Sequence, residues 1–169
     1  MIVTWYNYLM DNSDLLEKSL RTSFIDKNYL SPEEYHARLL RNDPEQNEKI
    51  ISHLLRSLQN CDEFYFSVAF ITMSGLIMLL KVLRELKKRG IRGKILTTDY
   101  LNFNDPAALR KLLTLDNVEV KVFDSGDFHT KCYIFKNADM YNIIVGSSHL
   151  TAGALTTNTE CNLTISSLR

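Results

Sequence analysis

The sequence has no long apolar run, little cysteine and no excess of charge of either sign. Its longest apolar stretch, residues 75–82, includes Lys81 and is far shorter than the roughly 20 residues that cross a bilayer, so no membrane contact is expected. The three cysteines are odd in number and no signal segment opens the chain, which predicts a cytoplasmic protein without disulfides. Because 20 basic residues balance 20 acidic ones, the charge argues against a strongly basic protein that coats DNA.

The sequence also lacks internal repeats and any Gly-x-x-x-x-Gly-Lys-Ser/Thr loop that would bind ATP. What it contains is ordinary for one globular domain: 169 residues, of which 45% are hydrophobic and 24% charged. We expect an N-terminal accessory segment over residues 1–30 and one domain over residues 31–169.

Hydrophobic periodicity and capping signals predict an alternation of helices and strands. Helices are expected over residues 14–21, 31–41, 47–58, 75–89, 105–115 and 150–155. Strands are expected over residues 63–70, 94–98, 118–123, 129–135 and 142–145, and near residues 162–165. This order predicts an α/β fold with a central mixed sheet.

His129 and Lys131 form the first candidate chemical pair. Side chains two residues apart in a strand share a face, so the imidazole and the ammonium are expected to project together, away from Cys132. Histidine can act as a nucleophile or base when neutral and as an acid when charged, whereas lysine supplies positive charge for a phosphate oxygen.

The second candidate element is Gly146-Ser147-Ser148-His149, which follows an apolar strand. Glycine permits close backbone approach, a serine can cap the short helix over residues 150–155, and free amides at a helix start bind anions. Glu160, thirteen residues after Ser147, is expected to hydrogen-bond an imidazole N–H and to fix its tautomer. These groups could surround one phosphate without a metal or an organic cofactor.

Taken together, His129-Thr130-Lys131 and Gly146-Ser147-Ser148-His149 resemble the His-x-Lys and Gly-Ser-x-Asn motifs of phospholipase D-type enzymes. Three further stretches resemble the branch found at the N-terminus of bacterial DEAD/DEAH-box helicases and in related restriction-type nucleases: residues 70–75, 93–100 and 158–162. The likeness runs from about Ser31 to the end of the chain. It implies a phospholipase D-like α-β-α sandwich around the mixed sheet.

The resemblance also implies a function, a phosphodiesterase or nuclease that acts on DNA through a phosphohistidine. His129, Lys131 and Glu160 would be catalytic, and Lys131, Ser147, Ser148 and His149 would bind the phosphate. Each site of the family needs two motifs and this chain has one, so a two-fold homodimer is expected. A helicase motor domain is a further expected partner if the chain is a fragment of a larger helicase or restriction protein.

Three positions depart from the family pattern. Lys136 stands where many relatives have aspartate, His149 replaces the usual asparagine, and Cys161 stands where this branch usually has tryptophan. The first two leave open a catalytically degenerate module that binds nucleic acid or mediates dimerisation.

Two metal-dependent alternatives are weaker. Glu119 and Lys121 resemble the Glu-x-Lys strand of metal-dependent restriction nucleases, but they lack a convincing upstream acidic partner. A zinc site could be built from His129, Cys132, His149 and Cys161. These residues lack the paired Cys-x-x-Cys spacing that is typical of structural zinc sites. No metal is therefore expected.

Overall fold

The computed structural model describes residues 37–99 and 104–168. The chain divides into two units, Met1–Ala37 and Arg38–Arg169, and the second unit is the one described below. No helix of the described residues is both long and apolar enough to cross a membrane.

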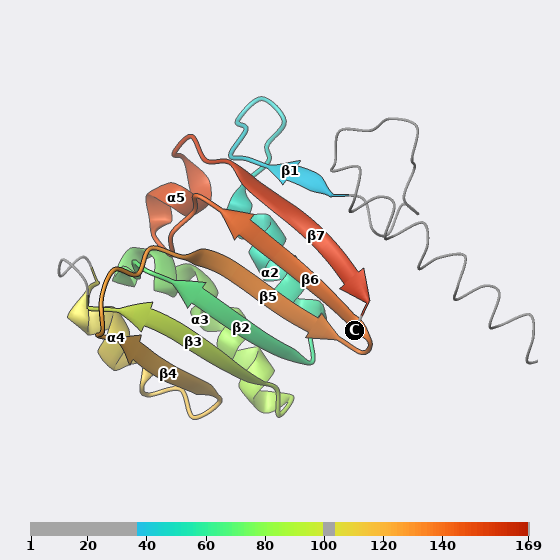
Figure 1. Cartoon of the computed structure of the whole chain (residues 1–169). Coiled ribbons are helices and arrows are strands. Elements are labelled where there is room, and N and C mark those ends of the chain that lie inside the picture. The colour runs from blue at the N-terminus through green and yellow to red at the C-terminus, as the bar shows by residue number, and fades with distance from the viewer. Residues whose placement is uncertain (1–36, 100–103, 169) are drawn as a thin grey trace, which may run out of the picture. The chain divides into compact units, whose positions relative to one another are not determined.

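One seven-stranded mixed sheet runs through this unit, in the order β1-β7-β6-β5-β2-β3-β4 (Figure 1). Strands β2, β3 and β4 pair in parallel and all other neighbours pair antiparallel. The bounds of the strands are β1 Arg38–Leu40, β2 Glu63–Val68, β3 Arg92–Thr98, β4 Val118–Phe123, β5 Lys131–Asn137, β6 Met140–Gly146 and β7 Asn162–Leu168. The predicted α/β fold with a mixed sheet is confirmed.

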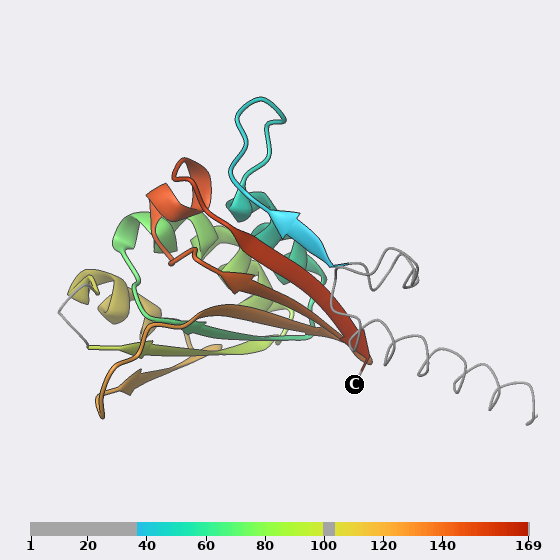
Figure 2. The same ribbon diagram turned by 45° about the horizontal axis from the view of Figure 1, so that its top comes forward.

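Four helices cover one face of this sheet (Figures 1 and 2). They are α2 Ile50–Asn60, α3 Met73–Lys88, α4 Pro106–Leu112 and α5 Ala152–Thr156. Apolar residues recur on α2 and α3 at helical spacing, and the alternate side chains of β2 and β5 meet them. The buried side chains at this interface include Leu54, Leu58, Leu76, Leu79, Leu83, Phe64, Phe66, Tyr133 and Phe135.

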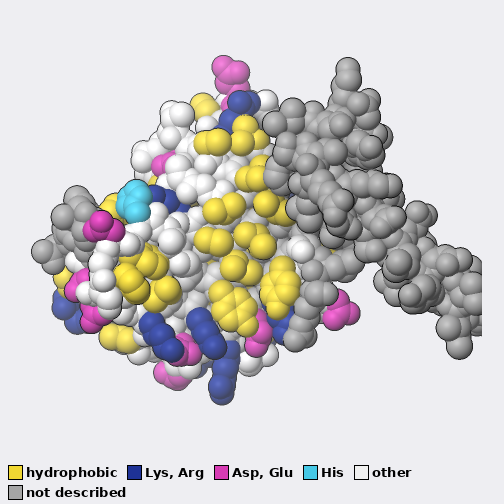
Figure 3. Space-filling model, in the orientation of Figure 1, with side chains coloured by type: hydrophobic (Ala, Val, Ile, Leu, Met, Phe, Trp, Pro, Cys, Tyr) yellow, Lys and Arg dark blue, Asp and Glu magenta, His cyan; other side chains and the backbone are white. Residues whose placement is uncertain are grey.

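The opposite face of the sheet is rich in apolar side chains. Cross-strand neighbours carry Cys132, Val145 and Leu163 in one row and Ile134, Ile143 and Ile165 in the next. Figure 3 looks onto this face and shows hydrophobic side chains gathered over β5, β6 and β7. None of the helices in the described part of the chain covers it.

Most of the predicted elements are present, with shifted ends. β4 has its predicted bounds, Gly90 ends α3 with a φ of 74°, and Asp105 caps α4 by accepting a hydrogen bond from the Ala107 amide. The helix predicted over residues 31–41 is wrong at its end, because Arg38–Leu40 form β1 and pair with β7. Residues 31–36 of that helix and the helix predicted over residues 14–21 lie outside the described residues.

Candidate active site

His129 and Lys131 lie in direct contact at the start of β5. The Lys131 Nζ atom is 2.6 Å from Nδ1 of His129 and 3.0 Å from its carbonyl oxygen. An ammonium group only donates, so Lys131 donates in this contact and Nδ1 of His129 accepts. His129 itself precedes the strand, since β5 begins at Lys131 and not at the predicted residue 129.

A second group of polar side chains lies where β6 ends and β7 begins. The Ser147 hydroxyl donates to Glu160 and accepts from the Cys161 amide at 3.0 Å. Burial lowers the pKa of Lys131, and the negative charge of Glu160 opposes that shift. The carboxylate therefore acts on Lys131 as well as on Ser147. The pairing of Cys132 with Val145 and of Gly146 with Asn162 places the two groups at the same end of the sheet.

Asn162, whose side chain is buried at 2% exposure, holds the loop that carries Ser147. Its side-chain oxygen accepts from the Ser148 amide at 3.2 Å, and its side-chain amide donates to the Ser148 hydroxyl at 2.8 Å. The Tyr133 hydroxyl donates to the Ser148 carbonyl at 2.9 Å. Because buried polar groups are costly to leave unpaired, these bonds hold the loop in one conformation.

Gly146 allows this loop to lie directly against β7. A Cβ atom on Gly146 would come within 2.3 Å of the Cys161 carbonyl oxygen and 2.5 Å of the Asn162 Cα atom. Both neighbours are backbone atoms, so the contact has no room for a side chain. Close backbone approach, which the sequence suggested for this glycine, is what the structure shows.

The rings of Phe70, His129 and His149 form an aromatic cluster beside these groups. Phe70 stacks on His149 with ring centroids 4.2 Å apart, and His129 meets His149 edge-on at 5.2 Å. Burial, with the positive charges of Lys131 and His129, lowers the pKa of His149 to about 4. A neutral imidazole carries one N–H, so His149 can donate only a single hydrogen bond to a phosphate.

Asn104 holds the segment that carries Phe70. Its side-chain amide donates to the Ala69 carbonyl at 2.8 Å, and its side-chain oxygen accepts from the Ile71 amide at 2.6 Å. Sequence reasoning missed both Asn104 and Phe70. The available signal was an aromatic residue at the end of a predicted strand, inside a stretch that resembled the family, but nothing local showed that its ring meets two histidines.

Three sequence expectations about this site differ from the contacts in the structure. Neither Ser147 nor Ser148 caps α5, because the cap is Thr151, whose hydroxyl accepts from the Ala154 amide at 3.3 Å. Ser148, expected to bind phosphate, is fully buried, and its hydroxyl accepts from Asn162. Glu160 bonds Ser147 rather than an imidazole within the chain.

Of the three departures from the family pattern, Lys136 lies away from the reactive groups and Cys161 meets them only through its backbone. Lys136 is near the other end of β5, where its Nζ atom is 3.4 Å from the Glu63 carboxylate. Cys161 contributes its backbone to the site, since its carbonyl accepts from the Ser147 amide at 3.1 Å. Only His149 stands among the reactive groups.

The metal-site alternatives gain no support from the geometry. No group of three or more His, Cys, Asp or Glu side chains within residues 37–99 and 104–168 is arranged to hold a metal ion. Glu119 and Lys121 pair with each other at 3.2 Å on the exposed face of β4, where they form a solvated ion pair.

Known proteins share this fold. NucT from Helicobacter pylori has a TM-score of 0.61 at 17% identity over 78% of this chain and 85% of that chain. Nuc, a phospholipase D family member from Salmonella typhimurium, has a TM-score of 0.60 at 20% identity over 78% of this chain and 83% of that chain. Polyphosphate kinase from Porphyromonas gingivalis has a TM-score of 0.56 at 10% identity over 77% of this chain and 23% of that chain. No protein with a curated description matches the sequence.

The sequence itself carries the family assignment. Residues 52–169 match the family described as "Cardiolipin synthase, PLD-like domain". That range includes His129, Lys131, Ser147 and Glu160, which the fold brings together at one end of the sheet. The chain therefore belongs to the phospholipase D-like family.

Proposed function

We propose that this chain is a metal-independent phosphodiesterase that cleaves DNA through a phosphohistidine on His129. The observation that carries the proposal is the 2.6 Å contact between Lys131 Nζ and His129 Nδ1, beside the Ser147 and Glu160 pair. In this contact Nδ1 of His129 is an acceptor with a lone pair, which attack on phosphorus requires, and Lys131 places a positive charge where phosphate oxygens would bind.

The reaction would proceed in two steps. The unprotonated nitrogen of His129 attacks phosphorus, a P–N bond forms, and the P–O bond to the leaving group breaks as an acid protonates that oxygen. Water then attacks phosphorus, gives up a proton, and releases the phosphate while the P–N bond breaks. Lys131 would leave the imidazole to hold a phosphate oxygen, and Ser147 would bind a second one.

The acid in this scheme requires a second imidazole, and a second copy of the chain is the source that we propose. His149 is the nearby alternative, but with a pKa of about 4 it holds almost no proton near pH 7. His129 of a partner chain, related by a two-fold axis, would complete the dyad. Val145, directly before the site loop, is 41% exposed and gives apolar surface for such an interface.

DNA is the proposed substrate because of the resemblance to helicase-linked and restriction-type nucleases. The same resemblance suggests that the module works beside a helicase motor. A specific observation favours a second candidate, a non-catalytic module that only binds nucleic acid: His149 occupies the position of a phosphate-binding carboxamide and can donate one bond only.

The test is cleavage of single-stranded and double-stranded DNA in EDTA by the native chain and by His129→Ala. We expect cleavage by the native chain and a loss of roughly 10²–10⁴-fold in His129→Ala. Thr130→Val is the matched control, because Thr130 is adjacent but bonds Ser67 on the other side of the strand.

Three outcomes separate the alternatives. Cleavage only after Mg²⁺ is added would contradict the proposed mechanism. DNA binding without cleavage by either protein would favour the non-catalytic module. An active protein that sediments as a monomer at assay concentration would contradict the shared two-fold site.

A further inference from the structure

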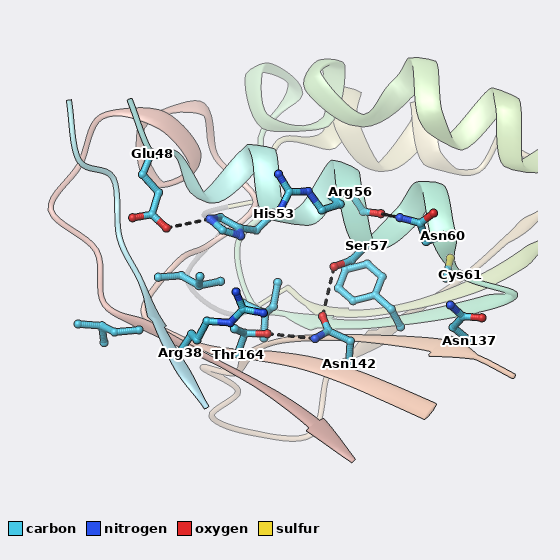
Figure 4. Close-up of a pocket in the computed structure, with 14 residues that line it drawn as sticks. Arg38, Glu48, His53, Arg56, Ser57, Asn60, Cys61, Asn137, Asn142 and Thr164 are labelled. Carbon is cyan, nitrogen blue, oxygen red and sulfur yellow. Dashed lines mark hydrogen bonds and ion pairs between the residues drawn. The ribbon is translucent and has the colours of Figure 1, made fainter. Parts of the chain in front are cut away.

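A pocket of ≈330 Å³ lies between α2 and strands β1, β5, β6 and β7, away from the His129 site (Figure 4). Its lining reaches Asn137 at the far end of β5, and six residues of strand from Lys131 span about 20 Å. The pocket shares no lining residue with the site of His129, Lys131, Ser147, His149 and Glu160. This volume is within the range of small-ligand sites and far too small for a nucleic-acid duplex.

The charges around the pocket favour an anion. Arg38 reaches it from β1 and Arg56 from α2, on opposite sides in Figure 4. Neither guanidinium has a hydrogen bond or ion pair with another of the described residues. The single lining carboxylate, Glu48, lies 3.0 Å from the His53 ring and is already engaged by it. Two free guanidinium groups suit the oxygens of a phosphate.

The floor of the pocket is apolar. It is made by side chains that are at most 2% exposed, namely Leu40, Cys61, Phe135 and Ile144. A bare inorganic anion would leave this floor covered only by water. The lining therefore fits a ligand with a charged head and a flat or apolar body.

Amide and hydroxyl groups complete the lining. The Asn142 side chain accepts from Ser57 at 3.2 Å and donates to Thr164 at 3.1 Å, which leaves one of its two N–H groups to donate. Thr164 accepts that bond, so its own O–H remains available to donate. Asn60 donates to the Arg56 carbonyl at 2.9 Å, which leaves its side-chain oxygen as an acceptor. The Thr164 donor and the Asn60 acceptor could therefore form hydrogen bonds with the edge of a nucleobase.

We propose that this pocket binds a nucleoside monophosphate, with the phosphate held between Arg38 and Arg56 and the base lying over the apolar floor. The proposal does not depend on catalysis at His129. A failure of DNA cleavage would leave it standing, and a failure of nucleotide binding would leave the proposed reaction standing.

The experiment is calorimetric titration of the full chain with dAMP, inorganic phosphate and deoxyadenosine, with hydrogen exchange used to locate the bound ligand. We expect one dAMP per chain, protection of α2 and of the β5–β6 hairpin, and at least tenfold weaker binding of both phosphate and deoxyadenosine. Arg56→Gln and Arg38→Gln should each weaken dAMP binding by about tenfold or more, as loss of a charge-assisted hydrogen bond does.

Arg41→Gln is the control of equal charge, because Arg41 pairs with Asp43 at 2.8 Å and does not line the pocket. It should leave dAMP affinity unchanged. The proposal is overturned if millimolar dAMP does not bind, if protection falls only around His129, or if Arg41→Gln weakens binding as much as Arg56→Gln. Equal affinity for phosphate and dAMP would also overturn it, since the floor would then contribute nothing.

Discussion

The Phe70 ring stacks on the His149 imidazole, with centroids 4.2 Å apart and 25° between the ring planes. The contact removes His149 from water in a site that already holds Lys131 and His129. Its protonation is therefore opposed both by lost hydration and by nearby positive charge, and its pKa falls to about 4. Because His149 is neutral near pH 7, it can donate one hydrogen bond to a phosphate at the position where the family has asparagine.

The same contact predicts a pH-dependent stability. An unfolded histidine has a pKa near 6.5, so between about pH 6.5 and 4 the unfolded chain binds more protons at this position than the folded one. The free energy of unfolding should fall as the pH drops through this window. Urea denaturation at pH 7, 6 and 5 measures it, and His149→Asn should show a smaller fall than the native chain. An equal fall in both proteins would contradict the assignment.

Lys131 predicts a limit to activity at alkaline pH. Burial lowers the pKa of its ammonium, so DNA cleavage should decline below the usual titration range of lysine, near 10.5. Lys131→Arg keeps a positive charge at any working pH and should remove this decline, whereas Lys131→Met should reduce kcat by roughly 10²–10³-fold at all pH values. The measurement is a pH–rate profile. Lys136→Met is the control, because Lys136 pairs with Glu63 away from the site.

Glu160 should also affect the pH–rate profile, because its charge opposes the effect of burial on the pKa of Lys131. Its negative charge raises the pKa of Lys131 and its carboxylate accepts from Ser147. Glu160→Gln keeps an acceptor for Ser147 but removes the charge, so the alkaline decline should move to lower pH. If Glu160→Gln lowers kcat but leaves the pH of the alkaline decline unchanged, Glu160 acts through Ser147 alone.

Gly146 predicts a cost in stability that is specific to the site loop. Gly146→Ala should lower the free energy of unfolding by roughly 1–3 kcal/mol, because the new methyl group would meet the backbone of Cys161 and Asn162. Gly153→Ala is the matched control, since its nearest contact, at 2.8 Å, is the exposed Asn158 side chain, which can move. Chemical denaturation of both variants checks the difference, and equal stabilities would contradict the packing argument.

Much of the fold was predictable because its signals are local. Apolar residues at helical spacing marked α2, and Asp105-Pro106 marked the start of α4, where Asp105 is the cap. β1 was not predictable in this way, because its three residues form a strand only by pairing with β7. In that pairing Arg38 lies opposite Thr164, and the two residues are too far apart in the sequence for a local pattern to predict their contact.

The site shows the same division. The proximity of His129 and Lys131 followed from their spacing, although His129 precedes the strand. The partners that hold the site could not be read from spacing. Asn104 and Asn162 are buried amides whose bonds reach across the fold, and Glu160 bonds Ser147 where an imidazole was expected. Local patterns predict reactive pairs, whereas supporting contacts depend on tertiary structure.

The central claim is that His129 forms a covalent bond to phosphorus, and rapid acid-free quenching of the reaction with ³²P-labelled DNA tests it most directly. The account predicts a label on the native protein that alkali leaves intact and acid removes, located by peptide mapping at His129 and missing from His129→Asn. Turnover by the native protein with no trapped label on His129, or an equally labelled His129→Asn, would contradict it.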